Sequence, residues 1–332
     1  MKALLSEVSG GPETLGVAEL PDPEIGPGQV IVDVKACGVN YPDSLIIRDL
    51  YQFKPDRPFS PGGEIAGVVS AVASDVDRVA IGDRVVALTV WGGMRQKVCL
   101  DAARVVKMPD AMPFDEAAAF LIAYGTSHHA LKNRAKLTEG ETLLVLGAAG
   151  GVGIAAVEIG ATWGARVIAA VSSQEKADFC KAHGATETII YPSGPFDKDG
   201  QKALAGLFKN ACGSRGADVI FDVVGGAYAE ASLRAIAWEG RYLVVGFPAG
   251  IPKIPLNLPL LKGCDIQGVF WGEFVNRDPE RHQANLEDLF TLYFSGRIRP
   301  SVSKHFPLSE AGGAIALLAS RKATGKIVVT MD

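Results

Sequence analysis

The chain has 332 residues, 48% of them hydrophobic and 21% charged, which is enough for two domains with separate cores. Its net charge of −4 at pH 7 argues against nucleic acid or an anionic membrane surface as the main partner. The N-terminal apolar run is too short for a signal peptide, and the longest uncharged stretch, residues 143–157, is glycine-rich and ends at Glu158, so we expect no membrane span and a cytoplasmic location.

The first 110 residues consist of short apolar runs separated by turns rich in proline and glycine. The strands predicted there are Lys2–Leu5, Leu15–Leu20, Val30–Cys37, Glu64–Val72, Arg84–Leu88 and Gln96–Leu100. Short strands at this spacing are typical of a β-rich, partly closed barrel. We therefore expect a separate β-rich domain at the N-terminus.

The pattern changes near Phe114, where helices 114–120 and 124–131 lead into alternating strands and helices. The predicted strands are 143–146, 166–171, 187–190, 218–221, 241–245 and 265–270, and the helices between them are 152–163, 175–183, 201–211 and 227–237. This alternation predicts an α/β fold with a doubly wound parallel sheet. After about Trp271, helices 285–294 and 309–319 and a closing strand, 326–330, return to the first domain. The predicted domains are 1–123, 124–270 and 271–332.

The apolar strand Leu143–Leu146 is followed by a glycine turn and then directly by a helix. The turn, residues 148–153, is a G-x-G-x-x-G pattern whose first glycine is Ala148. Gly150 lets the backbone approach a diphosphate, and Gly153 lets the helix pack close to the strand. Because a helix N-terminus presents free N–H groups, we predict a dinucleotide phosphate cradle. A tight turn without any ligand is the alternative, since the pattern alone is weak.

The tip of the second strand predicts which dinucleotide is bound. NAD-binding units place a carboxylate there for the ribose hydroxyls, whereas this strand ends in Ser172 and Ser173, with Lys176 one helical turn further on. Two hydroxyls and a cation favour a 2′-phosphate, and we predict NADP(H) over NAD(H). In the alternative interpretation, a serine only caps the following helix. The nearby carboxylate of Glu175 weakens the preference for NADP(H).

The cysteines and histidines give no metal-binding pattern. The five cysteines are scattered and include no C-x-x-C pair, which excludes a disulfide framework and a four-cysteine zinc site. His128 and His129 are adjacent in an apolar helix, where packing on opposite faces is a better explanation than chelation.

Several motifs together give the whole chain a resemblance to the zeta-crystallin-like quinone oxidoreductase branch of the medium-chain dehydrogenase/reductase superfamily. They are residues 38–43 (GVNYPD), 61–67 (PGGEIAG), 82–85 (GDRV), 148–153 (AAGGVG), 222–226 (DVVGG) and 323–326 (ATGK). The resemblance implies a Rossmann domain combined with a GroES-like catalytic domain. Zinc-dependent relatives carry a cysteine where this chain has Asn40 and a histidine where it has Gly63, so we expect a zinc-independent enzyme without bound metal.

The resemblance also implies roles for individual residues. The catalytic residues expected are Tyr51, Asn40 and Tyr41. Tyr51 is expected in the substrate cleft as a proton donor, and Tyr41, beside Asn40, competes for that role. For both tyrosines, the alternative is a residue that only lines the cleft. The residues expected to bind cofactor are Asn40, Thr126, Gly150, Gly151, Val152, Ser173, Lys176, Tyr191, Val224, Phe247, Phe270 and Lys326.

The predicted activity is NADPH-dependent hydride transfer to quinones, which accept hydride without a metal because the developing charge is delocalised. Activated C=C bonds, as in 2-alkenals, enones or enoyl-CoA esters, are the alternative substrates. A non-catalytic NADPH-binding structural or RNA-associated protein is a third interpretation.

Residues 264–271 would form an apolar edge strand, and relatives join their sheets there, so a homodimer is expected.

Overall fold

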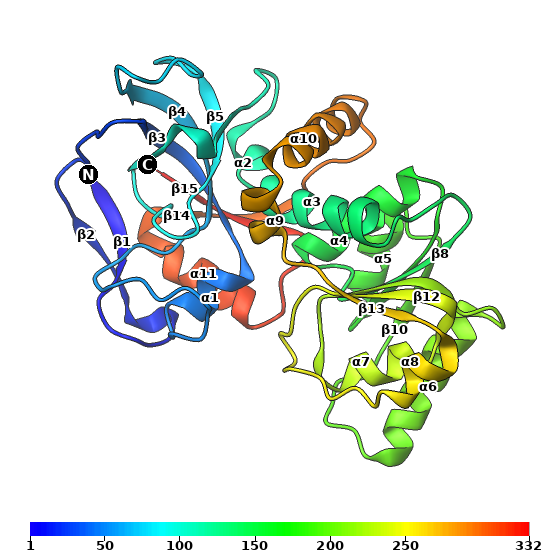
Figure 1. Cartoon of the computed structure of the whole chain (residues 1–332). Helices are drawn as coiled ribbons and strands as arrows, with labels where there is room; N and C mark the ends of the chain where they lie inside the picture. The colour runs from blue at the N-terminus through cyan, green and yellow to red at the C-terminus, as the bar shows by residue number, and fades with distance from the viewer. Residues whose placement is uncertain (332) are drawn as a thin grey trace. The chain divides into compact units, whose positions relative to one another are not determined.

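A computed structural model describes residues 1–331 and divides the chain into two compact units (Figure 1). The first unit contains Met1–Ile122 and the chain from Pro300 onward, and the second contains Ala123–Arg299. Within the described residues, no helix combines the length and the apolar character that crossing a membrane requires.

The first unit is built on a mainly antiparallel sheet. In spatial order its strands are β14 (Val302–Pro307), β15 (Lys326–Thr330), β3 (Gln29–Val39), β4 (Glu64–Val72), β5 (Arg84–Leu88) and β7 (Val105–Lys107), with β6 (Lys97–Asp101) also paired to β3. A separate antiparallel pair joins β1 (Lys2–Ser6) to β2 (Leu15–Glu19). Long strand β3 bonds to β4, β6 and β15, so the C-terminal strand is an integral part of this sheet.

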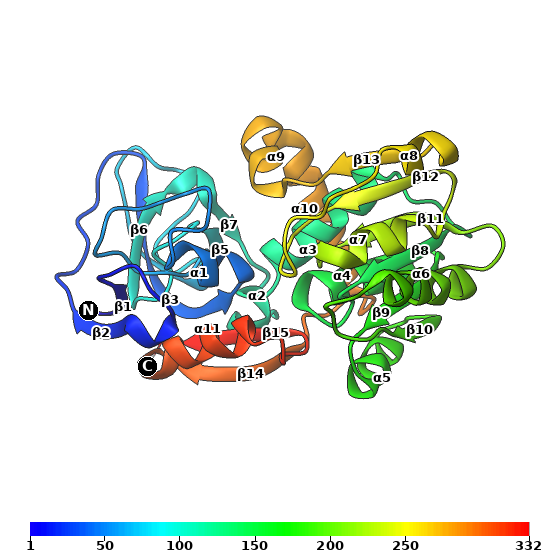
Figure 2. The same cartoon turned by 90° about the horizontal axis from the view of Figure 1, so that it is seen from below.

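Short helices complete the first unit. They are α1 (Tyr41–Ile46), α2 (Phe114–Ala117), α11 (Ala311–Ala319) and the 3₁₀ turns η1 (Pro12–Thr14), η2 (Ala102–Arg104) and η4 (Leu308–Glu310). Figure 2 shows α11 lying along β14 and β15. Its buried Ala314 and Ile315 pack into the same core as Val32, Ile65 and Val329 from the sheet. Burial of these apolar side chains holds the two separate stretches of chain in one domain.

The second unit contains a parallel sheet. Its strand order is β10 (Glu187–Ile190), β9 (Arg166–Val171), β8 (Thr142–Leu146), β11 (Ala217–Asp222), β12 (Ile236–Val244) and β13 (Asp265–Gly268). Central strand β8 is fully buried, which explains its unbroken apolar sequence, because both faces of the sheet are covered. The predicted doubly wound parallel sheet is confirmed, and the segment predicted as an edge strand contains the edge strand β13.

Helices cover both faces of the parallel sheet, with α3, α4 and α5 on one side and α6, α7 and α8 on the other (Figure 1). Their bounds are α3 (Leu121–His128), continued by the π-helical turn η3 (His129–Arg134), α4 (Gly151–Thr162), α5 (Gln174–Ala182), α6 (Lys198–Cys212), α7 (Gly226–Leu233), α8 (Asn257–Lys262), α9 (Trp271–Arg277) and α10 (Pro279–Phe294). The helix predicted at 227–237 is too long, because Ile236 already belongs to β12 and pairs with Ala217.

The point at which the chain returns to the first unit also differs from the sequence expectation. Residues 271–299, which contain α9 and α10, belong to the second unit, and the return begins at Pro300 rather than at residue 271. Both helices contact η3 of the second unit: His129 stacks on Phe274 of α9 with ring centroids 4.0 Å apart, and Asn285 of α10 donates to Asn133.

Candidate functional site

The glycine turn, where the sequence predicts a phosphate cradle, connects β8 to α4. Gly147 has a positive φ of 66°, and Gly150 is the N-cap residue of α4. A Cβ atom at Gly153 would clash with the Gly147 carbonyl oxygen and lie 2.8 Å from Ala148 Cα, so only glycine allows this close packing of helix on turn. At Gly150 a Cβ would have no neighbour nearer than 3.5 Å, which leaves the outer side of the turn open. The N–H groups of Gly151 and Val152 follow in the first helical turn, where no intrahelical partner exists.

The tip of β9 carries the predicted phosphate-binding group. The Ser173 hydroxyl accepts from the Lys176 backbone N–H at 3.3 Å and caps α5, as the alternative interpretation required. Lys176 Nζ lies 3.4 Å from the Ser172 hydroxyl oxygen, so the cation and a hydroxyl do meet at the strand tip. Burial lowers the pKa of Lys176. The buried Tyr191 follows β10, and its backbone N–H donates to Val171, which places it beside the same tip.

Three further predicted cofactor contacts come from loops of the second unit. Val224 and Phe247 lie in the loops after β11 and β12, and Phe270 precedes α9; both phenylalanine rings are exposed. The buried Asp222 at the end of β11 shapes the first of these loops, because one carboxylate oxygen accepts from the N–H groups of Val224 and Gly225. The motif 222–226 contains Asp222, but nothing in the sequence indicates that its carboxylate positions this loop.

Thr126 lies on α3, and its neighbour Ser127 ties that helix to the glycine turn. The fully buried Ser127 hydroxyl donates to the Val152 carbonyl oxygen at 2.7 Å. This bond fixes the first turn of α4 relative to α3. A serine in an apolar helix gives no sequence signal for such a role, and Ser127 was not predicted.

In the first unit, Asn40 and Lys326 meet in a buried polar cluster, although 286 residues separate them. Lys326 is 4% exposed, and its ammonium donates to Asn40 Oδ1 at 2.7 Å and to the Val39 carbonyl oxygen at 3.3 Å. Its charge is balanced by Glu64, whose Oε2 lies 3.5 Å from Nζ and accepts from Asn40 Nδ2 at 3.1 Å. The second Glu64 oxygen accepts from the Ile122 N–H. Each buried charge therefore has both an opposite charge and neutral hydrogen-bond partners.

Asp43 anchors the loop that carries this cluster. One of its oxygens accepts from the Asn40 N–H at 2.7 Å and the other from the Gly62 N–H at 3.0 Å. Burial raises the pKa of Asp43 to about 6, against the opposing effect of these two hydrogen bonds. Asp43 therefore fixes the backbone on both sides of the cluster.

Tyr51 belongs to a partly exposed aromatic group in the first unit. Its ring meets Phe53 edge-on at 5.8 Å, and Phe53 in turn contacts Trp91 at 6.4 Å. Burial, reinforced by the negative charge of Asp43, raises the pKa of the Tyr51 hydroxyl. The hydroxyl thus stays protonated at neutral pH, as a proton donor must. Tyr41 is the first residue of α1, next to Asn40, and is partly buried.

Residues 1–331 contain no group of three or more histidine, cysteine, aspartate or glutamate side chains that is arranged to hold a metal ion. All five cysteines are free thiols. Adjacent His128 and His129 pack against different aromatic rings, Trp163 and Phe274, rather than converging on one point.

The comparison with protein families matches both units of the chain. Residues 26–110 match the alcohol dehydrogenase GroES-like domain, and residues 151–289 match the zinc-binding dehydrogenase family. A GroES-like unit followed by a Rossmann sheet defines the class of the medium-chain dehydrogenases/reductases.

Individual relatives are similar over nearly the whole chain. Quinone oxidoreductase-like protein 2 of Rattus norvegicus is 35% identical over 96% of this chain and 89% of its own length. Quinone oxidoreductase of Pseudomonas aeruginosa is 34% identical over 96% of each protein. The crystal structure of Escherichia coli quinone oxidoreductase complexed with NADPH is 27% identical, with a TM-score of 0.90 over 99% of this chain and 100% of that one. The chain belongs to the quinone oxidoreductase family.

Proposed function

We propose that this chain is an NADPH-dependent, zinc-independent reductase that transfers hydride to quinones. The observation that carries the proposal is the buried Lys326 ammonium, bound by Glu64 and by Asn40, the residue that stands where zinc-dependent relatives have a cysteine. Asn40 and Gly63 stand where those relatives have cysteine and histidine, so the donor set for zinc is incomplete. The family resemblance in turn supports a catalytic role for the first unit and nucleotide binding by the second.

The second unit fits NADPH at two points. The open turn at Gly150 and the first N–H groups of α4 suit a diphosphate. The Ser172 hydroxyl and the Lys176 ammonium suit a 2′-phosphate, whose charge would offset the desolvation that lowers the pKa of Lys176. When bound, NADPH supplies the hydride. This fit agrees with the NADPH found in the related Escherichia coli enzyme.

The first unit fits a planar acceptor. The aromatic group of Tyr51, Phe53 and Trp91 can stack on a quinone ring. Reduction by hydride leaves negative charge on a quinone oxygen, and the protonated Tyr51 hydroxyl can donate a proton to that oxygen. Arg57 is already bound to Asp49 and to the Ile47 carbonyl oxygen, so it is not free to bind the phosphates of an enoyl-CoA ester.

The proposal is tested by an acceptor panel assayed in excess EDTA. We expect NADPH-dependent reduction of 9,10-phenanthrenequinone at a higher kcat/KM than that of a 2-alkenal, an enone or an enoyl-CoA ester, and less than stoichiometric zinc by elemental analysis. Preferred turnover of a C=C substrate would support the alternative activity. NADPH binding with no turnover of any acceptor would instead support a non-catalytic role.

Tyr51→Phe should lower kcat/KM for quinones by roughly tenfold or more, because it removes the proposed proton donor and keeps the ring. Steady-state kinetics with phenanthrenequinone measure this. Tyr41→Phe is the matched variant and should retain activity. If Tyr41→Phe loses activity and Tyr51→Phe does not, the proton donor is Tyr41.

Lys176→Met should weaken NADPH binding by roughly tenfold and leave NADH binding nearly unchanged, because only NADPH carries the 2′-phosphate that is proposed to bind this ammonium. Nucleotide fluorescence titrations measure both affinities. Lys181→Met, an exposed cation on the same helix, is the control and should not change either affinity. Equal losses for the two nucleotides in Lys176→Met would reject the 2′-phosphate assignment.

The chain is also proposed to form a homodimer through edge strand β13. Ile266 on this strand is 41% exposed, and the nearby helix α8 and loop add the exposed side chains of Leu256, Leu260 and Leu261. An apolar sheet edge of this kind is normally covered.

Ile266→Lys should convert the dimer to a monomer at micromolar concentration, as measured by light scattering after size exclusion. Ile190→Lys is the matched control, because Ile190 is 45% exposed on β10 at the opposite edge of the same sheet. It should remain dimeric. A wild-type chain that is monomeric under these conditions would contradict the proposal.

A further inference from the structure

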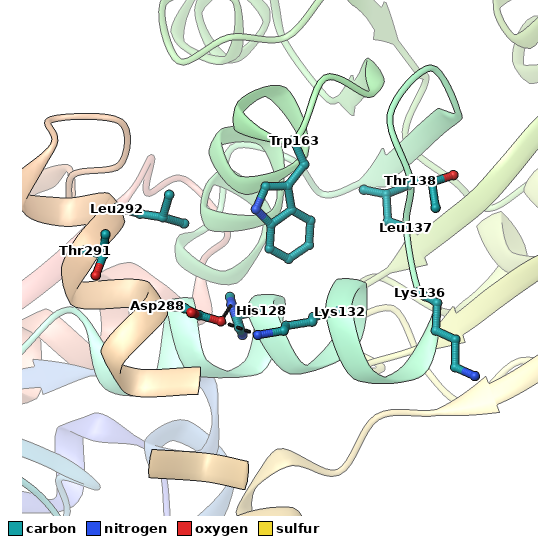
Figure 3. A pocket seen from close by; sticks show the side chains of 9 residues that line it. All are labelled: His128, Lys132, Lys136, Leu137, Thr138, Trp163, Asp288, Thr291 and Leu292. Carbon is teal, nitrogen blue, oxygen red and sulfur yellow. Dashed lines mark hydrogen bonds and ion pairs between the residues drawn. The ribbon is translucent and has the colours of Figure 1, made fainter. Parts of the chain in front are cut away.

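The second unit contains a pocket at the end of α4 opposite to the glycine turn. It has a volume of about 520 Å³ and is shown in Figure 3. Its walls come from α3 and its π-helical extension, the segment 136–138, the end of α4 and α10. The lining residues are His128, Lys132, Lys136, Leu137, Thr138, Trp163, Asp288, Thr291 and Leu292. Trp163 caps the C-terminus of the 12-residue α4, about 18 Å along the helix from the turn at its start. The pocket is therefore separate from the proposed nucleotide site.

His128 is a buried polar group whose hydrogen-bonding capacity is unused. It is 1% exposed, and within residues 1–331 neither ring nitrogen has a hydrogen-bond partner. The nearest carboxylate oxygen, on Asp288, lies 3.7 Å from Nε2, and the same oxygen is bound by Lys132. Burial, helped by the charge of Lys132, lowers the pKa of His128 to about 4. The ring is therefore neutral at pH 7, with one N–H to donate.

The side chains around His128 form an apolar slot with a cationic end. Trp163 meets the imidazole edge-on at 5.4 Å, and Leu137 and Leu292 line the same space. Figure 3 shows the Trp163 ring facing the space above His128 and Lys132. The Lys132 ammonium lies beside His128 and is paired with Asp288, whereas the Lys136 side chain extends away from this space in Figure 3. The slot thus combines a flat aromatic wall, an unused N–H donor and a lysine ammonium.

We propose that this pocket binds a small aromatic carboxylate. The aromatic ring would lie against Trp163, Leu137 and Leu292, and the carboxylate would accept hydrogen bonds from His128 and the Lys132 ammonium. A carboxylate fits because its oxygens can accept from both the Lys132 ammonium and the His128 N–H. It would also satisfy the His128 nitrogen, whose missing hydrogen bond is unfavourable in a buried position.

The test uses 1-naphthoate as the probe and the full chain, with isothermal titration in the presence and absence of excess NADPH. We expect saturable binding that NADPH does not displace, and binding of uncharged 1-naphthamide that is about tenfold weaker. Displacement by NADPH would place the probe in the nucleotide site and overturn the proposal, as would the absence of saturable binding at millimolar concentration.

Variants then assign the contacts. Lys132→Met and His128→Phe should each weaken naphthoate binding about tenfold, whereas Lys132→Arg should retain it. Lys202→Met, an exposed cation on α6, is the matched control and should bind as the wild type does. His128→Phe keeps a ring against Trp163, and thermal melting checks its fold. If that variant does not fold, the naphthoate affinity of Lys132→Met decides between the outcomes, because Lys132 is partly exposed and its substitution should not disturb the fold. Unchanged affinity in Lys132→Met would overturn the proposal.

Discussion

Lys326→Met is expected to lower the free energy of unfolding by about 3–5 kcal/mol, the usual effect of removing one partner from a buried ion pair. The substitution keeps the length of the side chain and removes the charge that balances Glu64, which is fully buried. It also removes the donor to Asn40 Oδ1. The loss arises mainly because Glu64 would remain as an unpaired charge away from water. Denaturant unfolding monitored by circular dichroism measures it.

A double variant separates this explanation from loss of packing. Lys326→Met combined with Glu64→Gln leaves no unpaired charge, so most of the lost stability should return. Lys97→Met is the surface control: Lys97 pairs with Asp22, both side chains are well exposed, and the unfolding midpoint should hardly change. A single Lys326→Met variant as stable as the wild type would show that the Lys326–Glu64 contact does not hold the cluster together.

The same cluster shows where prediction from sequence ends. Lys326 and Asn40 were predicted as cofactor contacts through separate motifs, but no pattern indicated that Glu64 joins them, because Glu64 is 262 residues from Lys326. Glu64 is the first residue of β4, and a carboxylate at a strand end is usually exposed, so its position gives no signal of burial. Only the pairing of β3 with both β4 and β15 brings the three side chains together.

The parallel sheet was more predictable than its surroundings. Strands such as Leu143–Leu146 are buried on both faces, so their apolar runs and glycine boundaries are strong local signals. The short helix Tyr41–Ile46 was missed because six residues with one proline give no helical periodicity. The end of α7 was misplaced because Ala235 and Ile236 suit a helix or a strand, and pairing with β11 decides between them. A long-range contact thus determined the second of these errors, and the shortness of the helix determined the first.

The glycine turn allows a prediction that separates nucleotide binding from folding. Gly150→Ala should fold normally, because its φ of −78° suits alanine and the nearest atom to the new Cβ is 3.5 Å away. The methyl group would, however, stand on the open side of the turn, where the diphosphate of NADPH is proposed to lie. We therefore expect NADPH affinity to fall by roughly tenfold or more with little change in melting temperature.

Gly153→Ala, in contrast, should lower the stability of the fold itself. The added Cβ would clash with the Gly147 carbonyl oxygen and crowd Ala148, so α4 must move away from β8. Overpacking of this kind costs about 1–3 kcal/mol or more, and nucleotide affinity should fall with it because the cradle is distorted. Gly206→Ala in α6, where nothing lies within 4 Å of the new Cβ, is the control and should stabilise the protein slightly. Equal loss of stability in Gly150→Ala and Gly153→Ala would contradict this account, because only the second glycine is enclosed by its own turn.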